Sequence, residues 1–319
     1  MLAVHLENGC VSIRNKPLPR RGKGSALIRL RCAGICNTDL ELLRGYYGFR
    51  GTPGHEFVGQ VVEADSTKLV GRRVVGEINI ACGRCEWCAQ GLEKHCPARS
   101  VLGIARHPGA FSEYFTLPEK NLHLVPDSMT DEQAVFTEPL AAALKILDQV
   151  KIPKGAPVAV LGDGKLGLLI AQALYAAGAQ VKLYGHHRNK LQIAARAGVA
   201  VEWPRKRVPR AIYDWVVEAT GSAGGLNEAI QMTRPRGTVV VKSTIHEAVQ
   251  LEASAVVVNE ITLVGSRCGR FAPALRLLRS GKIRVEEMIA SRFPLAEAPQ
   301  AFAVAGSKGT LKVLLQCDF

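Results

Sequence analysis

The chain has 319 residues, which is enough for two domains with separate hydrophobic cores. Hydrophobic residues make up 47% and charged residues 22%, as in globular proteins, and no apolar run is long enough to span a bilayer. The formal net charge is +13, but the basic residues are scattered and only 6% of residues are aromatic, so a base-stacking surface is poorly supported. We therefore expect neither a nucleic-acid nor a membrane partner.

The first ten residues, MLAVHLENGC, lack a charged leader followed by an apolar core, and we predict no signal peptide. Four of the nine cysteines lie within fifteen residues, at 82–96. In a long chain without a secretory signal, this crowding favours metal binding over disulfides. The expected compartment is reducing, and we predict the cytoplasm.

The pattern of elements changes near residue 140. Before it come short apolar strands broken by glycine and proline, such as ALIRLRCAGIC (26–36), which are typical of a strand-rich, barrel-like domain. After it, strands and helices alternate from VAVLG (158–162) onward, which predicts a parallel sheet with helices on both faces. A helix near 272–281 and a final strand at 310–316 have no parallel partner and are expected to return to the first domain. The predicted domains are 1–139 plus 269–319, and 140–268.

The cysteine cluster reads CGRCEWCAQGLEKHC, with the spacing C-x2-C-x2-C-x7-C. Four thiolates can close a tetrahedral shell around Zn²⁺, and this spacing lets one loop supply them all. Four protein ligands leave no open position, so the predicted zinc is structural. The alternatives are four unrelated buried cysteines, or a nucleic-acid-binding zinc ribbon, which the mixed charge of the loop disfavours. The residues are Cys82, Cys85, Cys88 and Cys96.

Three separate segments, GICNTDLE, PGHEFVGQVV and FTEPLAAAL, carry further residues with metal-binding side chains. Each is weak alone, because a cysteine after Gly-Ile is usually core and a glutamate before proline often stabilises a helix start. A fourth segment, VAVLGDGKLG, has the G-x-G-x-x-G form, follows a predicted strand and opens a predicted helix. This is the context that a dinucleotide-binding turn requires, although a plain glycine turn is the alternative. The turn comprises Gly162, Gly164, Lys165, Leu166 and Gly167.

The order G-I-C-x-T-D, G-H-E-x-x-G-x-x-V, four-cysteine lobe, E-P-L-A and glycine fingerprint resembles the zinc-dependent medium-chain dehydrogenase/reductase family over nearly the whole chain. The glutamate in TEPLA is similar to the sorbitol, glucose and threonine dehydrogenase branch. The resemblance implies an α/β fold with a Rossmann-type doubly wound parallel sheet plus a strand-rich, GroES-like catalytic domain. It implies an oxidoreductase that transfers a hydride between a nicotinamide cofactor and an alcohol (a secondary alcohol, polyol or sugar), interconverting alcohol and ketone or aldehyde.

By this resemblance the catalytic zinc ligands are Cys36, His55 and Glu138, and Glu56 is a nearby carboxylate that can approach the metal. Three protein ligands leave one position open for water or an alcohol oxygen, and Zn²⁺ lowers the pKa of a bound hydroxyl. The neighbouring residues have implied roles as well. Thr38 can take the alcohol proton, and Asp39 can orient the imidazole of His55. Many relatives continue the relay through a histidine where this chain has Glu41. Either Glu41 is the terminal base, or the relay uses the cofactor ribose and solvent.

Further cofactor contacts are implied by the resemblance. Thr220 and Gly221, in VEATG, would lie near the adenosine, and Ser266, in VGSRCG, near the nicotinamide. Lys312 stands where relatives often place a cation near the pyrophosphate.

The segment LYGHHRNKL (183–191) follows the next predicted strand, where an acidic residue would bind the ribose hydroxyls of NAD. Gly185 stands there, which removes a carboxylate that would repel a 2′-phosphate. Arg188 can make a bidentate contact with that phosphate, and His186 or His187 and Lys190 can add donors. We therefore predict a preference for NADP(H), with solvated residues at a helix start as the alternative reading.

Most relatives have a crossover helix where this chain has a basic loop, PRKRVPR (204–210). The loop is either solvated or attracts the anionic cofactor. The strand ITLVGS (261–266) would lie at a sheet edge, and the family pairs two subunits there, so a homodimer or homotetramer is expected. The expected partner is a small alcohol or carbonyl substrate. Two other functions stay open: a zinc-free quinone or enone reductase of the same fold, and a non-catalytic nucleotide-binding zinc protein.

Overall fold

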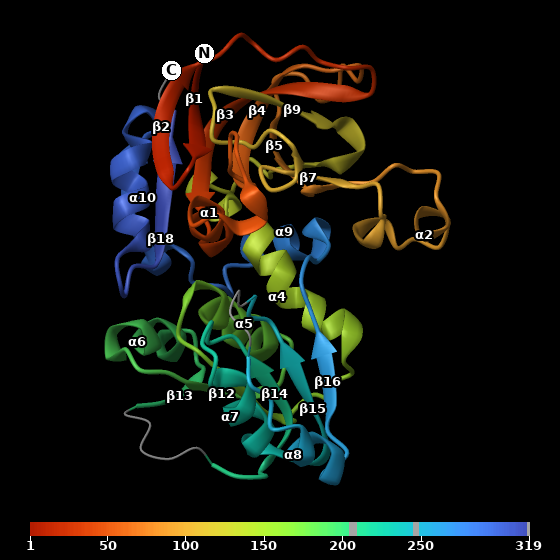
Figure 1. Ribbon diagram of the computed structural model, residues 1–319, viewed down its shortest axis with the longest axis vertical. Coiled ribbons are helices and arrows are strands. Elements are labelled where there is room, and N and C mark those ends of the chain that lie inside the picture. The colour runs from red at the N-terminus through yellow and green to blue at the C-terminus, as the bar shows by residue number, and fades with distance from the viewer. Residues whose placement is uncertain (204–208, 245–248, 318–319) are drawn as a thin grey trace. The chain divides into compact units, whose positions relative to one another are not determined.

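The structure is a computed structural model that describes residues 1–203, 209–244 and 249–317 (Figure 1). The chain divides into two compact units, Met1–Glu138 with Ile289–Phe319, and Pro139–Met288. Residues 269–288 therefore belong to the second unit, whereas the sequence analysis assigned them to the first. Contacts within the second unit explain the difference, because the Arg284 backbone N–H donates to Gln172 Oε1 at 2.7 Å and a side chain at Gly269 would overlap the Ala141 backbone.

Unit 1 contains a seven-stranded sheet in the order β10-β5-β4-β3-β18-β17, with β9 also paired to β3. Only β17 and β18 are parallel. The last strand pairs with β3 through Val313↔Ile35 to Gln316↔Cys32, so the final strand returns to unit 1 as predicted. The strands are β3 (Ser25–Ile35), β4 (Glu56–Glu63), β5 (Arg73–Gly76), β9 (Tyr114–Pro118), β10 (Leu122–Leu124), β17 (Ile289–Pro294) and β18 (Lys312–Gln316).

Smaller elements complete unit 1. A hairpin joins β1 (Leu2–Glu7) and β2 (Cys10–Asn15), and a three-stranded sheet joins β6 (Asn79–Ile80), β7 (Ser100–Leu102) and β8 (Arg106–His107). The helices are α1 (Asn37–Leu43), α2 (Glu86–Ala89), α3 (Asp131–Ala134) and α10 (Ala298–Gly306), with 3₁₀ turns η1 (Tyr46–Gly48), η2 (Glu93–His95), η3 (Glu119–Asn121) and η5 (Leu295–Glu297). Alternate residues of β3 are fully buried, which places its apolar face in the core.

Unit 2 contains a six-stranded, wholly parallel sheet in the order β13-β12-β11-β14-β15-β16. The chain starts at the centre with β11, builds outward to β13, and then returns to build β14 to β16 on the other side. This doubly wound order reverses between β11 and β14, and ligands of such sheets bind outside the carboxyl ends of the strands at that point. The strands are β11 (Pro157–Leu161), β12 (Gln180–Tyr184), β13 (Ala200–Glu202), β14 (Tyr213–Glu218), β15 (Thr233–Val241) and β16 (Thr262–Gly265).

The helices of unit 2 flank this sheet (Figure 1). The helix α5 is the most buried of them, with eight buried residues from Gly167 to Leu174, because its leucines and alanines recur around much of its circumference. The helices are α4 (Thr137–Gln149, whose first two residues belong to unit 1), α5 (Lys165–Ala176), α6 (Arg188–Arg196), α7 (Gly225–Met232), α8 (Ala253–Val258) and α9 (Phe271–Arg279), and η4 spans Glu286–Met288.

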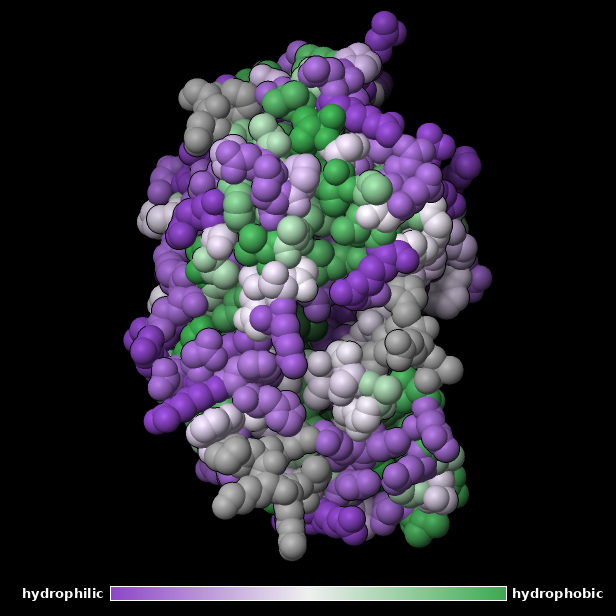
Figure 2. Space-filling model, turned by 60° about the vertical axis from the view of Figure 1, so that its left-hand side comes forward, coloured by the Kyte–Doolittle hydropathy of each residue, from purple (hydrophilic) through white to green (hydrophobic). Residues whose placement is uncertain are grey.

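Hydrophilic residues cover much of the face shown in Figure 2, with apolar residues between them. In the described part of the chain, no helix combines the length and the apolar composition needed to cross a membrane. Most of the predicted basic loop, 204–208, lies outside the described residues, and Arg210 at its end is exposed.

Candidate metal centres and cofactor site

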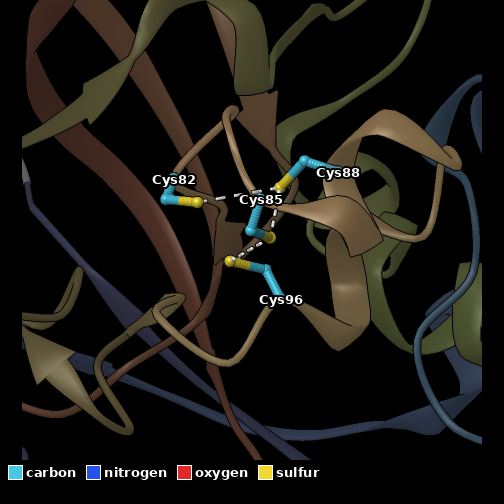
Figure 3. Close-up of side chains that lie close together, drawn as sticks. All are labelled: Cys82, Cys85, Cys88 and Cys96. Carbon is cyan, nitrogen blue, oxygen red and sulfur yellow. Dashed lines mark hydrogen bonds between the residues drawn. The ribbon is translucent and has the colours of Figure 1, made fainter.

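Four cysteine side chains of unit 1 point toward one another in a small lobe built from α2, η2 and the turns beside them (Figure 3). Their ligand atoms all lie within 4.8 Å of one another. The measured Sγ–Sγ separations are 4.0 Å for Cys82–Cys88, 3.5 Å for Cys85–Cys88 and 3.7 Å for Cys85–Cys96. Four thiolates about 2.3 Å from a tetrahedral zinc would be about 3.8 Å apart, so the cluster fits such an ion.

Few of the side chains in this lobe are buried. Cys82 is exposed, Trp87 is 44% exposed, and only Cys96 is deeply buried among the four cysteines. The backbone N–H of Arg84 donates to the Cys82 sulfur and lowers the pKa of Cys82 to about 6, which favours the thiolate that a metal requires. All nine cysteines are free thiols, so no disulfide provides an alternative cross-link.

A second group of donors forms where β3 and β4 meet. Cys36 follows the last residue of β3, and the pairing of Gly34 with Glu56 places it beside the start of β4. The ligand atoms of Cys36, His55 and Glu56 lie within 4.8 Å of one another. Sheet register therefore brings together residues that are about twenty positions apart in sequence.

Asp39 is fully buried and anchors this group. Its Oδ2 accepts the backbone N–H of Cys36 at 2.9 Å, which caps α1, and its Oδ1 accepts the N–H of Gly54 at 3.2 Å. His55 Nδ1 lies 3.4 Å from Asp39 Oδ1, longer than a normal hydrogen bond, so the contact is mainly electrostatic. Burial disfavours the imidazolium of His55, but Asp39 and Cys36 outweigh it, and the pKa of His55 lies well above its ordinary value. The orienting role of Asp39 stays a prediction.

Glu56 has a partner on one side only. Its Oε2 accepts from Lys312 Nζ in an ion pair whose side chains are both 1% exposed. Its Oε1 is buried and has no hydrogen-bond partner among the residues that the structure describes. An orphaned carboxylate oxygen beside a cysteine and a histidine fits a metal ion, because a cation would satisfy it.

Two predicted residues, Glu138 and Lys312, have positions that differ from the simplest expectation. Glu138 lies in the first turn of α4, outside the group formed by Cys36, His55 and Glu56. Lys312, expected at a cofactor pyrophosphate, is instead the buried counter-ion of Glu56. Burial disfavours the ammonium of Lys312, but Glu56, Cys36 and Glu138 together raise its pKa, so Glu138 also lies close enough to act on it.

The predicted proton-relay residues lie on α1. Thr38 Oγ1 is 3.8 Å from Cys36 Sγ. Glu41 is held by Arg44, one turn along the helix, at 2.6 Å. After α1, the rings of Tyr46 and Tyr47 stack with their centroids 3.9 Å apart. Tyr47 has a positive φ of 57° and is 73% exposed.

In unit 2, all the cofactor residues predicted from this unit follow carboxyl ends of strands or start the helices that come next. Gly162, with φ of 109°, makes the tight turn after β11, and a Cβ there would lie 2.9 Å from Thr220 Cα. A Cβ on Gly167 would overlap the Gly162 carbonyl, so α5 can approach the turn this closely only with glycine. Gly164 is the N-cap of α5, and Lys165 and Leu166 open the helix, whose N-terminal end suits a pyrophosphate.

Gly185, His186 and His187 follow the end of β12. The Asp163 carboxylate, from the glycine turn, contacts both histidines. Asp163 Oδ2 accepts the backbone N–H of His186 at 2.8 Å and of His187 at 2.6 Å. His187 Nδ1 also lies 3.1 Å from each oxygen of that carboxylate. Burial raises the pKa of Asp163, but these contacts outweigh burial and hold the pKa below its ordinary value.

Arg188, at the start of α6, is exposed and lies over the ring of Trp203, 5.7 Å from its centroid, whereas Lys190 is buried. The indole N–H of Trp203 donates to the His186 carbonyl at 3.0 Å. The residues from Gly185 to Arg188 are thus contacted from two sides.

Thr220, Gly221 and Ser266 each form a hydrogen bond with a neighbouring polar side chain. Glu218 Oε1 accepts from the backbone N–H and the hydroxyl of Thr220, both at 2.7 Å. Gly221 N–H donates to Ser243 Oγ at 2.8 Å. Lys242 donates to Ser266 Oγ at 3.2 Å and to the Ala142 carbonyl at 2.7 Å. These contacts fix the loops after β14, β15 and β16.

Sequence reasoning did not identify Asp163, Trp203, Glu218 or Lys242. Asp163 occupies a position of the glycine fingerprint that admits any residue, and Trp203 follows a three-residue strand. The signal that could have identified Asp163 is a carboxylate within the fingerprint of a chain that lacks the usual acid after its second strand.

Comparison with known proteins agrees with this architecture. Residues 22–127 match the alcohol dehydrogenase GroES-like domain, and residues 166–280 match the zinc-binding dehydrogenase domain. Sorbitol dehydrogenase of Halalkalibacterium halodurans is 29% identical over 96% of each chain.

Two solved structures are similar over almost their full lengths. A zinc-binding dehydrogenase target from Sinorhizobium meliloti 1021, solved with NADP, is 33% identical, with a TM-score of 0.90 over 99% of this chain and 98% of that one. Alcohol dehydrogenase TADH from Thermus sp. ATN1 is 30% identical, with a TM-score of 0.89 over the whole of both chains. The chain thus combines a parallel sheet and a glycine turn with a GroES-like unit, and its relatives match it from end to end. It belongs to the zinc-dependent medium-chain dehydrogenase/reductase family and is an alcohol-dehydrogenase-like oxidoreductase.

Proposed function

We propose that the protein oxidises polyols, sugars or other secondary alcohols, or reduces the matching carbonyls, with two zinc ions per chain and a preference for NADP(H). The observation that carries the proposal is the convergence of Cys36, His55 and Glu56 with an unsatisfied buried carboxylate oxygen. A zinc-free reductase would have no use for this group. Sorbitol dehydrogenase among the relatives supports the polyol class.

The proposed catalytic zinc would be held by Cys36 and His55, with Glu56 or Glu138 as the carboxylate. When bound there, zinc supplies Lewis acidity to an alcohol oxygen. Glu56 belongs to the convergent group, so it would be close enough to approach a metal held by Cys36 and His55, whereas Glu138, the predicted third ligand, lies in the first turn of α4.

The surrounding residues prepare the site for proton removal. Asp39 holds the His55 ring and the Cys36 backbone, so it orients two ligands at once. Thr38 Oγ1 would accept the proton of the substrate hydroxyl by hydrogen bond. Beyond Thr38 the path continues either through Glu41, which Arg44 holds on the same helix, or through the cofactor ribose and solvent.

The cofactor would lie along the carboxyl edge of the parallel sheet, with its pyrophosphate at the start of α5. The preference for NADP(H) is supported by the absence of an acidic residue at 185, by Arg188, and by the NADP found with the Sinorhizobium relative. We do not propose Lys312 as a cofactor contact, because it is buried against Glu56.

We also propose a homodimer, or a dimer of dimers, that works in the cytoplasm. The strand β16 is an edge of the sheet, and apolar residues are exposed on it and on the preceding helix, including Leu263 at 37%, Val257 at 75% and Val258 at 79%. An exposed apolar edge is normally covered. Light scattering should give twice or four times the mass of 34.4 kDa, and Val257→Lys with Val258→Lys should shift it toward the monomer.

One sample tests the enzymatic proposal. Zinc counted by mass spectrometry should be two per chain, and a panel of polyols, sugars and secondary alcohols should be oxidised faster with NADP⁺ than with NAD⁺. Thr38→Val should lower kcat/KM by about 10²–10⁴-fold while Thr38→Ser retains most of it. One zinc per chain with reduction of activated double bonds would contradict the proposal.

A further inference from the structure

Residue 185 is a glycine, but a carboxylate from another residue, Asp163, lies next to it. Asp163 is 6% exposed and lies within the glycine fingerprint. A Cβ built on Gly185 would be 2.6 Å from Asp163 Cβ and 2.6 Å from Asp163 Oδ2. The Asp163 side chain therefore occupies the space into which an acid at 185 would have to grow.

An acid at residue 185 and the Asp163 carboxylate would accept hydrogen bonds from different donors. An acid after the second strand of such a sheet accepts hydrogen bonds from the two ribose hydroxyls of NAD. Asp163 instead accepts from the backbone N–H groups of His186 and His187 and faces the His187 ring. Its lone pairs are directed to the protein's own donors, and its charge is offset by them.

A second side chain, that of Trp203, also contacts this loop. The Trp203 indole N–H donates to the His186 carbonyl at 3.0 Å, and its ring lies beneath the Arg188 guanidinium at 5.7 Å. Arginine stacked on an aromatic ring loses fewer conformations on binding than a free arginine does. One tryptophan therefore fixes both the backbone before Arg188 and the direction of its side chain.

We propose that Asp163 and Trp203 are positioning residues that hold the 185–188 loop and Arg188 in the arrangement that receives the 2′-phosphate of NADP(H). This inference rests on the proposed preference for NADP(H) and adds the two residues that produce it. A loop held in its binding arrangement before the ligand arrives loses less entropy on binding, so its affinity is higher. Neither residue needs to touch the phosphate.

Asp163→Asn gives a test with opposite signs for the two possible roles. If Asp163 acts only as a negative charge near the phosphate, its removal strengthens binding of a 2′-phosphate. If it is a positioning residue, the loss of an acceptor loosens the loop and weakens that binding by about tenfold. We expect the second outcome.

The measurement is calorimetric titration of adenosine 2′,5′-bisphosphate and of adenosine 5′-monophosphate (AMP) into the purified protein, without substrate. The two nucleotides differ only in the 2′-phosphate, so the ratio of their dissociation constants isolates its contribution. Trp203→Leu, at a position 47% exposed, should weaken the bisphosphate by about fivefold and leave AMP nearly unchanged. Trp203→Phe keeps an aromatic face without the N–H and should fall between Trp203→Leu and the unmodified chain.

Asp214→Asn is the matched control, because it removes the same charge from an exposed ion pair with Arg234 near the amino end of β14. It should leave the ratio unchanged. Equal binding of both nucleotides by the unmodified protein would overturn the NADP(H) preference and this inference with it. A preference that survives both Asp163→Asn and Trp203→Leu would overturn this inference alone.

Discussion

Lys312 is the buried counter-ion of Glu56, and the pair joins the last strand of unit 1 to the first residue of β4. The two residues are 256 positions apart in sequence. Because Glu56 is also a candidate metal ligand, this lysine determines how much negative charge the proposed zinc centre carries. The ammonium of Lys312 reduces the net negative charge of the group formed by Cys36, His55 and Glu56.

Replacing Lys312 with methionine should destabilise the protein by about 3–5 kcal/mol, because it leaves a buried carboxylate without its partner. Urea unfolding followed by circular dichroism measures the change. Methionine retains the packing of the lysine stem, so the loss should be due to charge. Combining it with Glu56→Gln should recover part of the stability, and a loss of less than 1 kcal/mol in the single variant would contradict the assignment.

Gly34→Ala should disturb the same ion pair by steric contact. A Cβ at this position would lie 2.5 Å from Glu56 Oε2 and 3.1 Å from Lys312 Cδ. We expect a loss of about 1–3 kcal/mol in stability and a lower zinc content at the Cys36 centre. Gly22→Ala is the control, since nothing lies within 4 Å of its added Cβ, and it should change stability by no more than about 0.5 kcal/mol.

Cys88→Ser should reduce the zinc content from two ions per chain to one and loosen the lobe without unfolding the rest of unit 1. The lobe has few buried side chains, so the metal would be its main cross-link. Limited trypsin digestion should then cut after Arg84 or Lys94 faster than in the unmodified protein. Cys10→Ser, at an exposed cysteine on β2, should leave both zinc content and digestion unchanged.

The Asp163 carboxylate should make stability depend on pH on the acid side. Its pKa is lowered in the folded protein because the hydrogen bonds from His187 and His186 outweigh the opposing effect of burial. The stabilisation is therefore complete above the unfolded pKa of about 3.9 and is lost as the pH falls through the lower folded value. The free-energy difference between the unmodified protein and Asp163→Asn should have its full value near about pH 5 and shrink below about pH 4. A difference that stays the same or grows as the pH falls below about 4 would show that the carboxylate is not held in this way.

Local patterns were sufficient for much of this structure. The alternation of strands and helices after residue 140 predicted the parallel sheet, and the spacing of Cys82 to Cys96 predicted a convergent cluster, because both depend on neighbours in sequence. The family resemblance, rather than any local pattern, indicated that Cys36 and His55 would meet.

Contacts that depend on register between distant segments were not predictable in the same way. The partner of Lys312 follows from the pairing of β18 with β3 and of β3 with β4, which no short pattern encodes. The role of Asp163 was hidden for a different reason, since a carboxylate can serve the protein or a ligand and only its partners distinguish the two.

The position of β18 also constrains the order in which this chain can fold during its synthesis. Residues of unit 2 leave the ribosome complete, while unit 1 still lacks β17, α10 and β18. Until Lys312 emerges, residues 32–35 of β3 have an open edge on the side away from β4, and Glu56 lacks its buried counter-ion. Unit 2 can therefore complete its sheet during synthesis, whereas the sheet of unit 1 is complete only after β18 has been made.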